Sequence, residues 1–463
     1  MPENQAIPTM KKFFALIILL TGFTAYGQNQ IDICIHDYNT RPIKIAVYYA
    51  DRLNITDSTI TDSKGCCRFY FQSGHPLGMY NLLVDNKPSI DFFYSGNAFS
   101  ITANYKNLND SLSFNNSSEN TDYQSFIKAE SEHNRKMEVL KNCIDNFPQN
   151  DRFYEQISKK LISEQIDFEV YLNKLVTKNK ASVAGNYMNM RHKVLFDAEP
   201  GTERRIEFMK QHFFDRISFA DTTLINTNAY SKLAIEYLGL YSNPSLDKNA
   251  LQAEFIKGIG MIMDKAAENR KVYDFVVKYL IDGFERFGFE DVIQFISDKY
   301  IPGTCENETR KSELAGRIEI IKRLAPGNPA PALSGKSPDG KQFSMNDFSG
   351  KWKLLIFWAS WCPHCMDMLP KLTEIYNSSD RKVWEIIGYS IDSDINAWKA
   401  ELETQKYPWI QLSELNGWDS KTAMDYGVFA TPVFFLINPE NQIVAKPANF
   451  YEIREALKKN NLL

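Results

Sequence analysis

A continuous apolar run in the last third of the chain ends close to two cysteines that stand two residues apart. The run "WKLLIFWA", residues 352–359, is typical of a buried strand, and Pro363 directly follows Cys362 in the motif "CPHC". Proline is tolerated in the first turn of a helix, where its missing N–H costs nothing, so the pattern predicts a helix over residues 363–376. A buried strand that leads into a helix favours an α/β sheet covered on both faces.

The alternation of buried strands and helices continues to the end of the chain. "WEIIGYSI" predicts a second buried strand, residues 394–405 a helix, and "TPVFFLI" with "QIVAK" a closing pair of strands before a last helix. Upstream, the segment "LAPGNPAPALSG" carries three prolines that interrupt helical structure. We therefore expect an α/β domain over residues 326–463.

The preceding sequence changes its hydrophobic period once. Residues 28–120 alternate apolar and polar positions, as in "IDICIH" and "IKIAVYY", which predicts short strands and a β-sandwich-like domain. Residues 121–325 carry apolar positions at helical spacing, which predicts an all-helical domain. The expected fold class is therefore multidomain: all-β, then all-α, then α/β.

The N-terminal 27 residues differ from the rest. Lys11 and Lys12 precede an apolar run over residues 13–20, and small residues precede Gln28. This pattern predicts a secretory signal peptide over residues 1–27, with a retained membrane anchor as the alternative. No later run has the roughly 20 apolar residues that a transmembrane helix needs. We expect a soluble, exported protein of the periplasm or cell envelope.

Export would place the seven cysteines in a compartment where disulfides persist. Cys66 and Cys67 are neighbours, so in a strand they point to opposite faces and are not expected to bond to each other. A bridge from Cys34 to either of them stays open. Cys143 and Cys305 are isolated in the sequence.

The expected position of Cys362 at a helix N-terminus has a chemical consequence. Unsatisfied N–H groups and the positive end of the helix dipole stabilise a thiolate there, and His364 adds a further donor or a positive charge. Cys365, one turn on and more enclosed, suits the resolving thiol that attacks a mixed disulfide. A zinc site would need two more ligands, and no second C-x-x-C motif is present, so we expect neither a metal nor a cofactor.

The sequence "GNPAPALSGKSPDGKQFSMNDFSGKWKLLIFWASWCPHC" resembles the TlpA/ResA-type thioredoxin-like family, as does "GVFATPVFFLI". The resemblance implies a thioredoxin fold, a cis peptide before Pro432 opposite the thiols, and a catalytic set of Cys362, Cys365, His364 and Pro432. It implies substrate contacts through Trp361, Pro363 and Thr431. The β and helical regions resemble accessory segments found ahead of such modules in exported bacterial proteins of Bacteroidetes type.

Two departures from the family pattern bear on mechanism. Thioredoxins carry an aspartate six residues before the first active-site cysteine, and this chain has Ile356 there. The proton acceptor for Cys365 is therefore not identified by the resemblance. The dipeptide Pro363-His364 resembles oxidising DsbA-type proteins, whereas the surrounding sequence resembles reducing relatives, so the direction of electron flow stays open.

These features predict an exported thiol-disulfide oxidoreductase that exchanges disulfides with thiol- or disulfide-containing envelope proteins and with a redox partner. The alternative is an envelope binding or assembly protein with a redox-sensing module, and a homodimer stays open. A thiol peroxidase fits poorly, because Ser360-Trp361 stands where such enzymes usually have a threonine. His212 and Asp215 are interpreted as a helix-surface pair. The net charge of −4 does not indicate a nucleic-acid partner.

Overall fold

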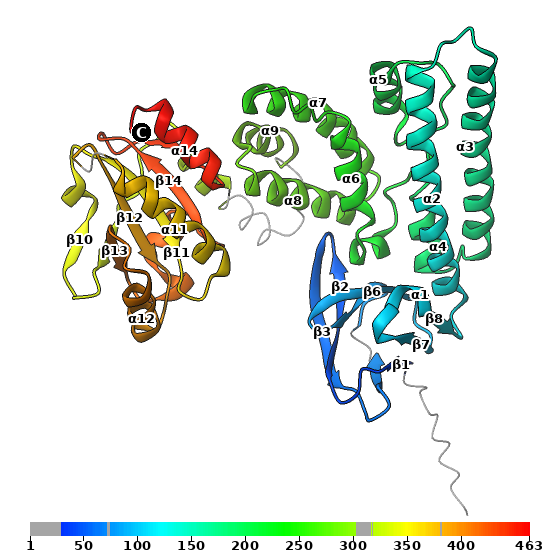
Figure 1. Ribbon diagram of the computed structural model, residues 1–463, viewed down its shortest axis with the longest axis horizontal. Helices are drawn as coiled ribbons and strands as arrows, with labels where there is room; N and C mark the ends of the chain where they lie inside the picture. The colour runs from blue at the N-terminus through cyan, green and yellow to red at the C-terminus, as the bar shows by residue number, and fades with distance from the viewer. Residues whose placement is uncertain (1–28, 72–74, 302–315, 317, 380–381) are drawn as a thin grey trace, which may run out of the picture.

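The computed structural model describes residues 29–71, 75–301, 316, 318–379 and 382–463. The predicted signal peptide over residues 1–27 and Cys305 lie outside these residues. Figure 1 shows three parts in chain order: strands near the N-terminus, a long helical region, and a C-terminal mixed sheet with its helices. This order agrees with the predicted fold class.

The N-terminal part contains two four-stranded sheets that share one apolar core, as predicted for a sandwich. The first sheet has the order β4-β1-β7-β8, with β1 and β7 parallel. Its strands are β1 (Asn29–His36), β4 (Cys66–Phe71), β7 (Phe99–Asn104) and β8 (Ser113–Asn115). The second has the order β3-β2-β5-β6, with strands β2 (Pro42–Tyr49), β3 (Arg52–Ile60), β5 (Gly78–Val84) and β6 (Lys87–Tyr94). Two short helical segments precede β8: η1 (Tyr105–Asn107) and α1 (Leu108–Ser111).

A disulfide joins the first sheet across adjacent strands. Cys34 on β1 stands opposite Cys66 on β4, with 4.0 Å between the two Cα atoms, and their sulfurs are bonded. Cys67 has a free thiol. The expectation that Cys66 and Cys67 do not bond is therefore confirmed, and of the two partners left open for Cys34 the structure selects Cys66.

The helical region begins with a long hairpin of α2 and α3, seen in Figure 1, and continues with shorter helices. Side chains cap the two long helices, since Ser117 accepts from the Asn120 N–H and Asp151 from the Phe153 N–H. The elements are α2 (Ser118–Asn146), α3 (Arg152–Lys178), α4 (Val183–Asn189), α5 (Thr202–His212), η2 (Thr222–Asn226), α6 (Ala229–Gly239), α7 (Lys248–Ala266), α8 (Arg270–Arg286) and α9 (Glu290–Tyr300).

The outer face of the second β sheet packs against these helices. The ring of Phe93 on β6 lies 4.8 Å from that of Tyr123 on α2 and 5.3 Å from that of Tyr187 on α4. The buried amide of Asn120 pairs with the Phe93 backbone, accepting from its N–H at 2.6 Å and donating to its carbonyl at 2.8 Å. The β and helical parts therefore share an apolar core in addition to the core between the sheets.

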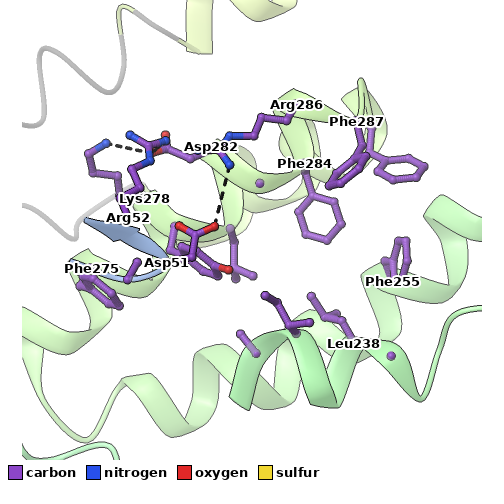
Figure 2. A pocket seen from close by; sticks show the side chains of 18 of the residues that line it. Asp51, Arg52, Leu238, Phe255, Phe275, Lys278, Asp282, Phe284, Arg286 and Phe287 are labelled. Carbon is purple, nitrogen blue, oxygen red and sulfur yellow. Dashed lines mark hydrogen bonds and ion pairs between the residues drawn. The ribbon is translucent and has the colours of Figure 1, made fainter. Parts of the chain in front are cut away.

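A cavity of about 520 Å³ opens between the β2–β3 turn and helices α6, α7 and α8 (Figure 2). At its rim Arg52 donates to Asp282 at 3.2 Å, and Arg286 pairs with Asp51 at 3.8 Å. The walls are mostly apolar and include Leu238, Phe255, Phe275, Phe284 and Phe289.

The C-terminal part is built on a sheet of order β10-β9-β13-β12-β11-β14-β15. Strands β11, β12 and β13 are parallel, and β14 runs antiparallel to β11. The elements are β9 (Ser334–Lys336), β10 (Gln342–Ser344), η3 (Met345–Phe348), β11 (Trp352–Trp358), α11 (Pro363–Asn377), β12 (Trp384–Ser390), α12 (Ile395–Gln405), β13 (Ile410–Ser413), η4 (Gly417–Asp419), α13 (Lys421–Asp425), β14 (Val433–Ile437), β15 (Ile443–Ala445) and α14 (Phe450–Lys459).

The connections β11–α11–β12 and β12–α12–β13 advance in the same direction along this sheet. Right-handed crossovers therefore place α11 and α12 on one face. The inner strands β11, β12 and β14 agree with the sequence predictions, whereas β13 was not predicted, because its four residues are too few to show a period.

A short helix over residues 318–323 joins the helical and C-terminal parts. Ile318 and Ile321 belong to the helical core, whereas Ile320 and Leu324 pack in the C-terminal core. Within the described part of the chain, no helix combines the length and apolar character needed to cross a bilayer.

Candidate active site

Cys362 is the N-cap of α11, as the sequence predicts. Its sulfur accepts from the Cys365 N–H at 3.3 Å, and Pro363 occupies the first turn of the helix. Strand β11 ends at Trp358, so Cys362 lies just beyond the carboxyl end of this inner strand. This is the position at which helix N–H groups can stabilise a thiolate.

The segment that contains Pro432 lies against the same sulfur. The Thr431–Pro432 peptide is cis, and the Cys362 thiol donates to the Thr431 carbonyl at 3.4 Å. Residues 69 positions apart in the sequence are thus brought together directly before β14. The cis peptide implied by the family resemblance is confirmed.

Cys365 is fully buried, and its thiol is free, as is that of Cys362. Burial raises the pKa of Cys365 to about 12, and its hydrogen bond with Cys362 acts in the same direction. At neutral pH this cysteine is therefore a protonated thiol. It needs a proton acceptor before it can attack a disulfide.

The remaining predicted site residues lie on the surface around Cys362. Pro363 and His364 are exposed, and Trp361 is 56% exposed. No hydrogen bond or ion pair with a described residue holds the His364 side chain. Trp361 packs edge-on against Trp418 with 5.9 Å between ring centroids.

Two exposed aromatic side chains near the thiols were not singled out by the sequence analysis. Trp418 is 44% exposed, and Phe429, two residues before Thr431, is 64% exposed. Neither could be predicted from the sequence, because a single aromatic residue in a loop carries no pattern. Trp418 extends the apolar surface that Trp361 forms next to Cys362.

A buried carboxylate, also missed from sequence, supports the loop before Cys362. Asp392 follows β12 and accepts from the Ser360 N–H at 3.0 Å and from the Ser360 hydroxyl at 2.6 Å. Ser390 donates a further hydrogen bond to it at 2.7 Å. The sequence feature that could have identified Asp392 is an acidic residue just after the carboxyl end of an inner strand.

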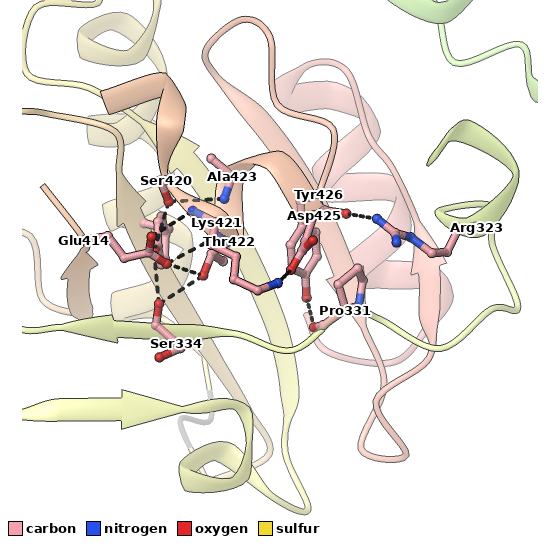
Figure 3. A network of polar contacts seen from close by, with 11 residues as sticks. Arg323, Pro331, Ser334, Glu414, Ser420, Lys421, Thr422, Ala423, Asp425 and Tyr426 are labelled. Carbon is pink, nitrogen blue, oxygen red and sulfur yellow. Dashed lines mark hydrogen bonds and ion pairs between the residues drawn. The ribbon is translucent and has the colours of Figure 1, made fainter. Parts of the chain in front are cut away.

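A second polar network anchors the segment that leads to the cis peptide (Figure 3). Glu414 accepts from the Tyr389 hydroxyl at 2.9 Å, from the Thr422 hydroxyl at 2.8 Å and from the Lys421 N–H at 2.8 Å. Although burial opposes it, these donors keep the pKa of Glu414 below its ordinary value. The network holds the start of α13 against the sheet.

Ile356 is buried on β11 at the position where thioredoxins have an aspartate. Among the described residues, no group of three His, Cys, Asp or Glu side chains is arranged to hold a metal ion.

A free dithiol at the start of a helix, following a central parallel strand and facing a cis-proline, defines the thioredoxin-like class of thiol-disulfide oxidoreductases. The C-terminal domain of this chain is of that class, and residues 326–446 match the model of the AhpC/TSA family.

The same part of the chain is similar to several named proteins. Over 129 residues the chain is 28% identical to thiol-disulfide oxidoreductase ResA of Bacillus cereus. The aligned residues cover 28% of this chain and 73% of that protein. It is 34% identical over 125 residues to thiol:disulfide interchange protein DsbE of Xylella fastidiosa, covering 26% of this chain and 56% of the relative. The thioredoxin domain of a thiol-disulfide oxidoreductase from Bacteroides vulgatus is 32% identical, with a TM-score of 0.28, covering 30% of this chain and 98% of that structure.

Proposed function

We propose that this protein is an exported thiol-disulfide oxidoreductase that exchanges disulfides with envelope proteins through Cys362 and Cys365. The observation that carries the proposal is the contact of the Cys362 sulfur with both the start of α11 and the Thr431 carbonyl beside the cis peptide. Cys362 itself is only 4% exposed, but its neighbours Trp361, Pro363 and His364 are exposed, so an extended partner chain can bind beside the thiol.

In the reducing direction, the Cys362 thiolate attacks one sulfur of a partner disulfide and forms a mixed disulfide, and the other partner sulfur leaves as a thiolate. Cys365 then loses its proton and attacks Cys362, which forms the Cys362–Cys365 disulfide and releases the second partner thiolate. The partner gains two electrons and the dithiol loses two. His364 is assigned to stabilise the Cys362 thiolate, and Trp361, Pro363, Thr431 and Pro432 to contact the partner.

Export is supported by two independent features. The N-terminal pattern is typical of a signal peptide. The Cys34–Cys66 bond is of the kind that persists in oxidising compartments, such as the bacterial periplasm.

The proposal is tested by the reduction of insulin by dithiothreitol in the presence of the purified protein. We expect the full chain to accelerate the reaction and Cys362→Ser to abolish the acceleration. Cys143→Ser is the matched control, because Cys143 is a free cysteine on α2, outside the C-terminal domain. No acceleration by the unmodified chain would contradict the proposal.

The direction of exchange is decided by a redox titration of the dithiol. A potential near roughly −120 mV would indicate an oxidant such as DsbA, and one near roughly −270 mV a reductant such as thioredoxin. If His364 stabilises the thiolate, His364→Ala lowers the potential, because it destabilises the reduced form.

A second candidate function, a binding or assembly protein whose thiols sense redox state, is favoured by the cavity of about 520 Å³ in the accessory parts (Figure 2). Its volume and apolar walls match those of ligand sites, and Phe287 at its lining is 66% exposed. Cys365→Ser separates the two functions. An oxidoreductase accumulates partners as mixed disulfides that dithiothreitol releases, whereas a binding protein retains its partners under reducing conditions.

A further inference from the structure

The cavity between the β2–β3 turn and helices α6, α7 and α8 has walls that hold one another in place (Figure 2). The rings of Phe255, Phe284 and Phe289 form a cluster with centroid distances of 5.6, 5.6 and 6.0 Å. On the opposite side of the cavity, Phe275 packs edge-on against Tyr49 of β2, with 5.2 Å between centroids. A preformed cavity of about 520 Å³ with mostly apolar walls is typical of a small-molecule site.

A glycine within α8 leaves room in this cavity. Gly283 lines the cavity and shares a helix face with Leu280 and Phe287, which line it too. Apart from its chain neighbours and the backbone of its own helix, no heavy atom of the described residues lies within 4 Å of the position that a Cβ would take at Gly283. Glycine destabilises a helix relative to alanine, and no close contact requires it here. Its effect is to keep a side chain out of the cavity.

The charged residues that line the cavity leave its rim with one positive charge in excess. Arg52, Lys278 and Arg286 are cationic, and Asp51 and Asp282 are carboxylates. Asp282 accepts through one oxygen from both Arg52 at 3.2 Å and Lys278 at 3.1 Å. Arg286 stands 3.8 Å from Asp51, too far for a hydrogen bond, and its side chain is 54% exposed (Figure 2). Its planar guanidinium therefore has donors available for a further carboxylate, which it can bind through two parallel hydrogen bonds.

We propose that this cavity binds an amphipathic monocarboxylate of the fatty-acid type, with its apolar chain between α6, α7 and α8 and its carboxylate on Arg286. One negative charge balances the excess at the rim, whereas a dianionic head group would leave a negative excess. The chain covers the ring of Phe287, which is 66% exposed. A peptide segment fits less well, because the apolar walls leave its N–H and C=O groups without partners. The inference is independent of thiol exchange and gives the second candidate function a ligand class.

Isothermal titration calorimetry of dodecanoate into the full chain, below the concentration at which dodecanoate forms micelles, tests the assignment. We expect saturable binding to one site per chain. Dodecylammonium has the same chain and the opposite charge. We expect it to bind at least about tenfold more weakly, because it gains no ion pair with Arg286 and is repelled by the excess positive charge. Acetate, which is the head group alone, should show no saturable binding.

Two substitutions separate the contributions of the chain and the head group. Gly283→Leu places a side chain in the cavity and should weaken dodecanoate binding by about tenfold or more. Ala253→Leu is the matched control: it adds a side chain at an exposed position of α7 outside the cavity and should leave the affinity unchanged. Arg286→Gln should weaken dodecanoate binding about tenfold, the lower end for a charge-assisted hydrogen bond, and should not weaken the binding of dodecylammonium.

Circular dichroism checks the fold of each variant, and Arg286→Gln, at an exposed position, decides the question if Gly283→Leu unfolds. The proposal is overturned by the absence of saturable dodecanoate binding, by equal affinity for dodecanoate and dodecylammonium, or by unchanged affinity in both variants. Insulin reduction by the same preparations should be equal in all of them, because the cavity lies outside the C-terminal domain. Its absence in the unmodified chain overturns the thiol exchange instead and leaves the ligand site intact.

Discussion

Cys362 and Cys365 lie within one turn at the start of α11. Their surroundings differ, and so does the chemistry expected of each thiol. The Cys362 sulfur lies at the N-terminal end of α11, beside the Thr431 carbonyl, and the neighbouring residue Trp361 has an exposed ring. The Cys365 sulfur is enclosed by the sheet, and burial raises its pKa to about 12. Position along one helical turn thus separates a thiol at the helix N-terminus, which is 4% exposed, from one that is 0% exposed and held protonated.

This difference predicts the order and pH dependence of alkylation. At neutral pH iodoacetamide should modify Cys362 first. In Cys362→Ser, labelling of Cys365 should rise about tenfold per pH unit between pH 7 and 10, because the thiolate fraction grows in that proportion well below the pKa. Mass spectrometry of the labelled peptides measures both rates.

Unfolding in guanidinium is the control, since it removes the burial and should bring Cys365 labelling at pH 8 close to that of an ordinary cysteine. Equal labelling of the two cysteines in the folded protein at neutral pH would contradict the assigned surroundings.

At the scale of elements, a buried ion cluster joins three helices of the central region. Arg191, directly after α4, donates from Nε to Glu130 on α2 at 3.0 Å and from both Nη atoms to Glu236 on α6 at 3.0 and 2.8 Å. Its side chain is only 2% exposed. Removing one partner of such a cluster destabilises the protein, because it leaves buried charges without compensation. The intact cluster itself contributes little net stability, because burying its charges costs free energy.

We therefore expect Arg191→Leu to lower the free energy of unfolding of the helical part by about 3–5 kcal/mol. Urea denaturation followed by circular dichroism measures the change. Lys159→Leu is the matched control: Lys159 pairs with Glu155 on the exposed face of α3, and its loss should cost about 0.5 kcal/mol or less. A similar shift of the denaturation midpoint in both variants would show that the buried cluster stabilises the fold no more than an exposed ion pair does.

At the scale of the whole molecule, the three parts are not equally independent. The β and helical parts share a core through Phe93, Tyr123 and Tyr187. The C-terminal part has its own core and is attached through the helix over residues 318–323 and by an ion pair of Lys446 with Glu290 at 2.8 Å. Figure 1 shows it standing beside α7, α8 and α9.

This arrangement predicts which fragments fold. Residues 318–463 should form a cooperative domain with the insulin-reducing activity, because the fragment retains its complete core. Residues 29–117 alone should aggregate or remain loosely packed, because they expose Met79 and Phe93, which the helices cover in the full chain. Near-ultraviolet circular dichroism and size-exclusion chromatography report both outcomes. A fragment 318–463 without fixed tertiary structure would contradict the prediction.

Much of this architecture follows from local patterns. Period-two alternation in "IDICIH" and "IKIAVYY" predicted β1 and β2, and the apolar run before "CPHC" predicted β11 and the cap of α11. These inferences succeed because hydrophobic period and helix-terminal chemistry depend on neighbours within a few residues. The cis peptide at Pro432 was accessible only through resemblance.

Sequence alone therefore determined the kinds of elements, the order of the three parts and the position of the two thiols at the start of a helix. The bond of Cys34 to Cys66, the hydrogen bonds that join Asn120 of α2 to β6, and the support of the loop at Ser360 by Asp392 became known only from the folded chain. The physical reason is that a hydrophobic pattern tells which face of an element is buried but not what it is buried against. Partners distant along the chain are selected by packing of the complete fold.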